Sequence, residues 1–183
     1  MASETVIRLA SDLEKDSIAN GPGLRMVVWT QGCPHHCPGC HNPQTWDETQ
    51  GIDVSVDSLL QQVKNTKLQK GITLSGGEPF RQAKALMPFV KECRQMGYDV
   101  WAFSGYYYEE LLADAQKKAL LELVDVLVDG PFEMDKKDFR LYYKGSSNQR
   151  IIDVPASIKA HQVVLSEYEQ HNIELEKMLA KQS

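Results

Sequence analysis

The sequence predicts an α/β fold, an open, partial (β/α) barrel with a curved, mostly parallel sheet. Short apolar runs alternate with stretches of helical periodicity, which is typical of parallel strands joined by crossover helices. At about 25 residues per strand–helix unit, the chain falls well short of the roughly 250 residues of a closed eight-stranded barrel. The glycine-rich and polar segments directly follow the apolar runs, where the carboxyl ends of parallel strands place ligand sites.

Five apolar runs predict the strands of this sheet. The first, RMVVWT, indicates a buried strand because its centre is continuously apolar. The second ends in two glycines, which mark a turn after a strand. The five runs cover residues 25–30, 71–77, 98–105, 124–130 and 150–154.

Three segments between these runs repeat apolar residues at helical spacing. In 56–63 the apolar residues stand at i, i+3, i+4 and i+7, which places them on one face of a helix. The segment 88–97 carries a similar face that includes Cys93, and Pro88 suits the first position of that helix. The segment 108–119 predicts a third helix with one apolar face.

The chain length predicts a single domain, residues 1–183, because 183 residues are enough for one hydrophobic core. We expect residues 155–183 to form a helical tail of that domain. In this tail Ser166 and Glu169 have the spacing of a capping box, in which two side chains satisfy backbone N–H groups at a helix start.

Composition and charge argue against several classes of partner. Hydrophobic residues make up 42% of the chain and charged residues 25%, as is ordinary for a globular protein. The formal net charge of −5 favours neither nucleic acid nor a membrane surface as a partner. We expect a cytoplasmic protein, because the chain has no apolar run of about 18 residues and no signal-peptide layout at its N-terminus.

Three of the four cysteines, Cys33, Cys37 and Cys40, form the pattern C-x3-C-x2-C directly after the first predicted strand. A structural zinc site usually takes four ligands in two separated pairs. The fourth cysteine, Cys93, lies on an apolar helical face, where a cysteine behaves as a small hydrophobe. A [4Fe–4S] cluster normally takes four thiolates. Three thiolates would leave one iron open, and an open position is what a catalytic metal keeps.

This triplet, followed by GGEP after the next predicted strand, resembles the radical S-adenosylmethionine enzymes. The segments NGPGLR (20–25), SGY (104–106) and DGPF (129–132) extend the likeness to the activating enzymes of glycyl-radical proteins. The similarity runs from about Asn20 to Arg150. GSSNQR (145–150) favours the branch that activates anaerobic ribonucleoside-triphosphate reductases over the pyruvate formate-lyase activators, which remain an alternative.

The resemblance implies an enzyme with two cofactors, a [4Fe–4S] cluster and S-adenosylmethionine. Cys33, Cys37 and Cys40 would be the catalytic metal ligands, and the open iron would bind the amino and carboxylate groups of S-adenosylmethionine. Reductive cleavage would give a 5′-deoxyadenosyl radical, which takes a hydrogen atom from one glycine of the large reductase subunit. The partners implied are that subunit and an external one-electron donor such as flavodoxin.

The resemblance also assigns a cofactor-binding role to other residues. Gly76, Gly77 and Glu78 match the motif that meets the methionine amino group. Gly39 and His41 flank Cys40, where the family contacts adenine. The wider superfamily usually has an aromatic residue in place of Gly39, so stacking on adenine would fall to His41. The expected contacts with ribose or carboxylate come from strand ends, at Ser104, Tyr106 and Asp129.

Two hypotheses from other classes of protein compete with the enzyme hypothesis. A small electron-transfer iron–sulfur protein would need four protein ligands and no second site, and GGEP argues against it. A zinc-bound interaction module would need more well-spaced ligands than the chain supplies.

Overall fold

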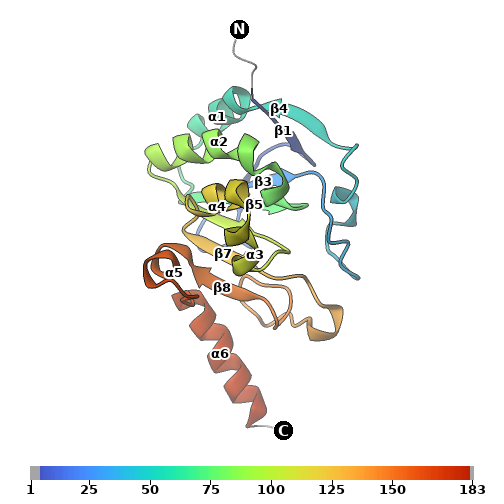
Figure 1. Ribbon diagram of the computed structural model, residues 1–183, viewed down its shortest axis with the longest axis vertical. Coiled ribbons are helices and arrows are strands. Elements are labelled where there is room, and N and C mark those ends of the chain that lie inside the picture. Colours follow the sequence, from blue (N-terminus) through green and yellow to red (C-terminus); the bar gives the residue numbers. More distant parts are fainter. Residues whose placement is uncertain (1–4, 182–183) are drawn as a thin grey trace.

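A computed structural model describes residues 5–181, which form one eight-stranded sheet with helices along one of its faces (Figure 1). The strand order is β4-β1-β3-β5-β6-β7-β8, and β2 pairs with β3 beside this path. The strands are β1 (Val6–Leu9), β2 (Glu14–Ser17), β3 (Arg25–Thr30), β4 (Ile52–Ser55), β5 (Gly71–Gly76), β6 (Asp99–Phe103), β7 (Val126–Asp129) and β8 (Arg150–Asp153).

The centre of the sheet is parallel and its flanks are antiparallel. Strands β3, β5, β6 and β7 run parallel to one another. The pairings of β1 with β3 and β4, of β2 with β3 and of β7 with β8 are antiparallel. The predicted fold class, an open α/β partial barrel, is therefore confirmed, with its parallel part in the core. All five predicted strands are present, whereas β1, β2 and β4 were not predicted.

Side chains alternate between the two faces of the sheet, as strand geometry requires. In β6, Val100 and Ala102 join the main core, while Trp101 belongs to a smaller cluster on the opposite face. Helices α1, α2, α3 and α4 cover the main core (Figure 1). The opposite face carries this smaller cluster and the pocket described below.

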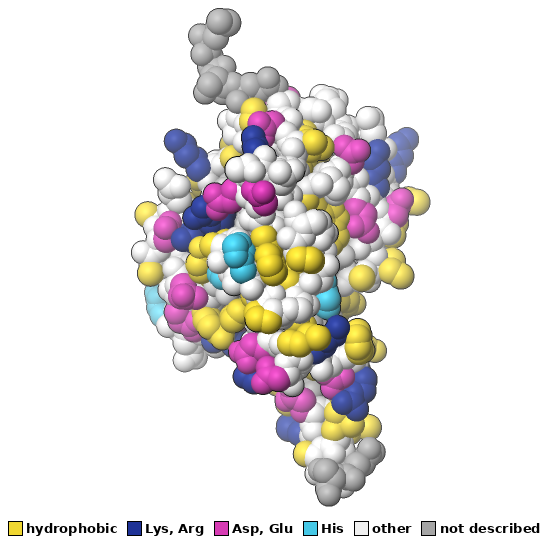
Figure 2. Space-filling model, turned by 90° about the vertical axis from the view of Figure 1, so that its right-hand side faces the viewer, with side chains coloured by type: hydrophobic (Ala, Val, Ile, Leu, Met, Phe, Trp, Pro, Cys, Tyr) yellow, Lys and Arg dark blue, Asp and Glu magenta, His cyan; other side chains and the backbone are white. Residues whose placement is uncertain are grey.

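The helices are α1 (Val56–Lys64), α2 (Ala83–Gln95), α3 (Tyr108–Ala113), α4 (Ala115–Leu121), α5 (Val154–Ala160) and α6 (Glu167–Ala180), with short 3-10 turns at Pro43–Thr45, Pro79–Gln82 and Met134–Lys136. Helix α6 projects from the body at the end opposite α1 (Figure 1). In Figure 2 this projection carries charged side chains of both signs, while hydrophobic and histidine side chains gather in the middle of the same view. None of the helices among residues 5–181 has the length and apolar character needed to cross a membrane.

Three local predictions about helices were wrong. Helix α2 begins at Ala83, so Pro88 lies inside it and not at its first position. The segment 108–119 is two helices, because the Asp114 backbone is extended and its carboxylate caps α4 by accepting from the Gln116 and Lys117 N–H groups. Ser166 does cap α6, but Glu169 turns away to bind elsewhere, so no capping box forms.

Candidate active site

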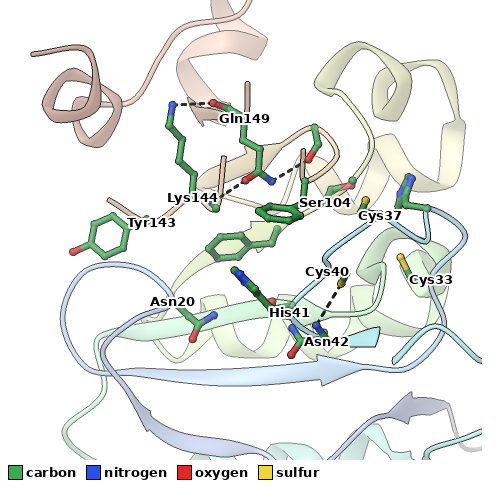
Figure 3. A pocket seen from close by; sticks show the side chains of 18 of the residues that line it. Asn20, Cys33, Cys37, Cys40, His41, Asn42, Ser104, Tyr143, Lys144 and Gln149 are labelled. Atoms are coloured by element: carbon green, nitrogen blue, oxygen red, sulfur yellow. Dashed lines mark hydrogen bonds between the residues drawn. The ribbon is translucent and has the colours of Figure 1, made fainter. Parts of the chain in front are cut away.

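A pocket of about 500 Å³ opens on the face of the sheet opposite helices α1–α4. The ends of the parallel strands meet there, as the sequence predicted from the strand–helix alternation. The cysteines lie at one end of the pocket, and Tyr143 and Lys144 lie at the other (Figure 3). Of the predicted site residues, the following line it: Cys33, Cys37, Cys40, His41, Gly76, Gly77 and Ser104.

The loop that carries the three cysteines is closed at its base by backbone hydrogen bonds. The Gly32 N–H donates to the Thr45 carbonyl (2.8 Å), and the Cys33 N–H donates to the Trp46 carbonyl (3.1 Å). The Gln31 side chain ties the same base together through the carbonyls of residues 44 and 47. The two ends of the loop are thus held together by the protein alone, which fixes the base of the cysteine loop.

Two glycines let this loop fold so closely. Gly39 has φ +73°, and a Cβ there would lie 2.6 Å from the Met134 sulfur. Gly77 passes directly under the loop base, where a Cβ would lie 2.4 Å from the Gly32 carbonyl oxygen. Hydrogen bonds from the Gly77 N–H to the Thr30 carbonyl and from the Glu78 N–H to the Gly32 carbonyl join β5 to the loop (both 2.8 Å). The GGEP turn and the cysteine loop therefore form one unit.

The three thiols fit an iron–sulfur cluster better than a set of inert side chains. All three are free and partly exposed toward the pocket. Burial raises the pKa of Cys33 and Cys37, so without a cation these thiols hold their protons. Binding of a metal cluster supplies the positive charge that releases those protons. The Asn42 N–H already donates to the Cys40 sulfur (3.3 Å), a contact that stabilises a thiolate.

Glu78 does not line the pocket, although the sequence assigned it to cofactor binding. Its side chain is fully buried. The carboxylate accepts from the Ser104 hydroxyl (3.0 Å), the Gly105 N–H (2.8 Å) and the Phe80 N–H (3.1 Å). Its second oxygen also lies 3.0 Å from His35 Nε2. Glu78 thus connects the cysteine loop with the ends of β5 and β6.

Asp129 is likewise buried behind the pocket and does not line it. It accepts from the Arg150 guanidinium (3.0 Å from Nε) and from the Tyr108 N–H (2.8 Å). Arg150 reaches on to Glu109, and the guanidinium lowers the pKa of that exposed carboxyl. In this structure Asp129 fixes the end of β7.

The remaining predicted residues have distinct surroundings. The Ser104 hydroxyl faces Glu78 at the pocket wall. The His41 ring lies 5.2 Å from the Phe132 ring in a tilted arrangement, next to Cys40. Gly39 faces Met134 and does not line the pocket.

Sequence reasoning missed two groups of residues at this site. His35 sits between two of the cysteines, but nothing local marks its partner Glu78, which is 43 residues away. Tyr143, Lys144 and Gln149 line the far end of the pocket. Gln149 belongs to the motif GSSNQR (145–150), and Tyr143 and Lys144 directly precede that motif, which is the signal that marks this end of the pocket in the sequence.

Cys93 lies apart from the pocket, as predicted. It is fully buried in the main core on α2, and burial raises the pKa of its thiol to about 12. Replacing Cys93 with Ala is expected to leave the iron content unchanged and to lower the free energy of unfolding by about 1 kcal/mol, because only a buried sulfur is lost. Iron analysis and urea unfolding measure the two effects. Loss of iron would instead identify Cys93 as a ligand.

Comparison with known proteins finds similar chains. Residues 19–152 match the family described as "4Fe-4S single cluster domain". The anaerobic ribonucleoside-triphosphate reductase-activating protein of Pasteurella multocida is 40% identical over 144 residues, 73% of this chain and 90% of the relative. The protein of that name from Escherichia coli (strain K12) is 37% identical over 140 residues, 72% and 90% of the two chains. The crystal structure of QueE from Escherichia coli superposes with a TM-score of 0.46 and 16% identity, over 55% of this chain and 52% of that one.

Proposed function

The chain belongs to the family of the anaerobic ribonucleoside-triphosphate reductase-activating proteins, and on this premise we propose that it generates the glycyl radical of such a reductase. The family model that it matches describes a single 4Fe-4S cluster, and under this proposal it is a radical S-adenosylmethionine enzyme whose second cofactor is S-adenosylmethionine. When bound, these two cofactors supply the one-electron cleavage of a carbon–sulfur bond that leads to hydrogen abstraction from a glycine. The chain itself supplies binding, orientation and charge.

We propose a division of roles among the pocket residues. Cys33, Cys37 and Cys40 would hold the cluster, and because the loop offers only these three thiolates, one iron would stay open to bind S-adenosylmethionine from the pocket. The backbone at Gly76 and Gly77 forms the adjoining wall, where main-chain acceptors suit an ammonium group. The proposed contacts with adenine and ribose come from Cys40, His41 and Ser104, which line the same pocket, and from Gly39, which lies beside Cys40 and faces Met134. Glu78 and Asp129 act from behind this wall, on the evidence of their buried carboxylates.

One observation carries the proposal. Three thiols from a single preorganised loop face the same pocket as the Gly76–Gly77 turn, while the fourth cysteine is buried in the core. A metal centre held by three protein ligands beside a cavity is built to bind a further ligand from that cavity. An electron-transfer site would instead be closed by a fourth protein ligand.

The proposed partners follow from the family and from the chemistry. The protein substrate is the anaerobic ribonucleoside-triphosphate reductase. The reaction consumes one electron, and we propose that a separate donor protein such as flavodoxin supplies it. We place the reaction in the cytoplasm, where a reducing environment keeps clustered thiols free to bind iron.

The test is an anaerobic reaction of the reconstituted protein with S-adenosylmethionine, a reductant and the reductase. We expect an organic radical signal in electron paramagnetic resonance and release of 5′-deoxyadenosine. A reductase with Ala in place of its radical-site glycine is the matched control, and it should give no such signal. Cleavage of the cofactor with no radical on the reductase would refute the assigned substrate. Absence of any cleavage by a fully iron-loaded protein would refute the enzyme assignment itself.

A further inference from the structure

The far wall of the pocket is one segment, residues 131–149, which we name the strap because it joins β7 to β8 across the pocket. Helix α6 lies beyond residue 152, where the match to the iron–sulfur family ends. We propose that α6 positions the strap, and that Glu169 is the positioning residue that holds Lys144 in the pocket wall. The functional part of this inference rests on the proposed use of the pocket for S-adenosylmethionine.

The central contact is a buried ion pair between the strap and α6. The Lys144 ammonium donates to Glu169 Oε1, and the two side chains are only 2% and 7% exposed. The same ammonium donates to the Gln149 carbonyl (2.9 Å). The other oxygen, Glu169 Oε2, accepts from the Ile151 N–H at the start of β8 (2.8 Å). One carboxylate therefore fixes both the strap and the strand that follows it.

A second contact binds the backbone of the strap to α6 through hydrogen bonds. The Asn172 side chain, itself fully buried, accepts from the Tyr142 N–H (2.8 Å) and donates to the Tyr142 carbonyl (3.1 Å). The Tyr142 ring also stacks on His171 at 3.7 Å. Paired hydrogen bonds to both backbone groups of one residue fix its position as a neighbouring strand would.

A third contact is aromatic and joins α6 to the sheet. Tyr168 meets Trp101 of β6 at 5.2 Å and Tyr143 of the strap at 5.8 Å, both edge to face. Such pairs add to the burial of the rings themselves. Because Tyr143 lines the pocket, α6 acts on the pocket wall through a side chain it touches directly.

These contacts bear on the pocket through Lys144, Gly145 and Gln149, which all line it. Figure 3 shows Lys144 reaching along the wall to the Gln149 backbone. The Gln149 side chain then accepts from the Gly145 N–H (2.8 Å) and donates to the Gly130 carbonyl (3.0 Å), which closes the strap on the end of β7. Glu169 touches none of the pocket and acts only through its neighbours.

The ion pair also affects the electrostatics of the pocket. S-adenosylmethionine carries a sulfonium cation, and an unpaired ammonium in the same wall would repel it in a partly desolvated pocket. Glu169 neutralises Lys144 at that wall. Loss of the carboxylate should therefore both loosen the strap and leave an uncompensated positive charge in the far wall of the pocket that takes the ligand.

The test compares Glu169→Gln with Glu174→Gln in the full-length, cluster-loaded protein. Glu174 is exposed on the same helix and bonds only weakly to Gln170 at 3.4 Å, so it is a matched loss of charge. For Glu169→Gln we expect amide hydrogen exchange of residues 140–149 to quicken and the affinity for S-adenosylmethionine to fall about tenfold or more. Iron content should stay at the wild-type level, and KM should change more than kcat. Glu174→Gln should match the wild type in each of these measurements.

A double variant separates the two consequences. Adding Lys144→Met to Glu169→Gln removes the uncompensated charge, so affinity for S-adenosylmethionine should recover in part while exchange of the strap stays fast. If Glu169→Gln fails to fold, Asn172→Ala tests the strap contact without any change of charge. Wild-type exchange and affinity in a folded Glu169→Gln protein would overturn the inference. Hydrogen exchange needs no turnover and no ligand, so it tests the contact between α6 and the strap by itself. If the proposed function is wrong, the wild type will not bind S-adenosylmethionine, and that result is distinct from a failure of the strap contact.

Discussion

Replacing any one of Cys33, Cys37 or Cys40 with Ala is expected to reduce cleavage of S-adenosylmethionine to the assay background. The physical reason is the small number of ligands: three thiols from one loop face the pocket. With one removed, two thiolates remain, too few to hold a four-iron cluster with a single open iron. The fourth cysteine cannot substitute, because it is buried in the main core on α2.

The measurements are iron and sulfide content after anaerobic reconstitution, and the rate of 5′-deoxyadenosine release. Cys93→Ala is the matched control, since it removes a thiol of the same size outside the pocket. The three loop variants should lose both iron and activity, whereas the control keeps both. Near-normal turnover by any of the loop variants would contradict the assignment of the site.

Replacing Glu78 is expected to have the second largest effect. Its carboxylate accepts from a hydroxyl and two backbone N–H groups, and it pairs with His35. In Glu78→Gln the amide presents N–H groups where an acceptor is needed, so at least one buried donor is left without a partner. Each such loss costs about 1–3 kcal/mol of stability. Binding of S-adenosylmethionine should weaken as well, because His35 holds the cysteine loop against the ends of β5 and β6.

A double-mutant cycle with His35→Gln tests whether Glu78 acts through the loop. If it does, the two substitutions should be coupled, with an interaction energy of about 0.5–3 kcal/mol in the free energy of ligand binding. His36→Gln is the control, because His36 stacks on Trp46 at 4.8 Å and lies on the same loop. If Glu78 instead met the ligand directly, Glu78→Gln alone would weaken binding and His35→Gln would have no effect.

The central strands could be predicted from the sequence because their signal is local. The runs at 25–30 and 71–76 are rich in apolar residues, and a segment with helical periodicity lies between them. A strand that is buried on both faces is marked in the sequence mainly by such an apolar run. The flanking strands carry no such signal. In β2, three of the four residues, EKDS, are exposed, so only its pairing with β3 makes it a strand.

The candidate site divides in the same way. The spacing C-x3-C-x2-C lies within eight residues, and the sequence alone therefore predicted the metal ligands and, through the resemblance, the cofactors. The sequence alone could not predict which way the carboxylate side chains point. Glu78 follows β5 as a ligand-binding residue would, but the donors that hold it come from residues 104 and 105 and from His35.

By itself, then, the sequence determined the parallel core and the cysteine loop, since periodicity and spacing within a short segment are enough to specify each, and it indicated the family through the resemblance of its motifs. Only the tertiary structure decided which polar groups face the pocket and which stand behind it. Glu169 has the spacing of a helix cap, yet it binds Lys144 of the strap. The physical reason is that a buried charge needs an opposite charge and hydrogen-bond partners, and those partners lie far away in the sequence and meet only in the folded chain.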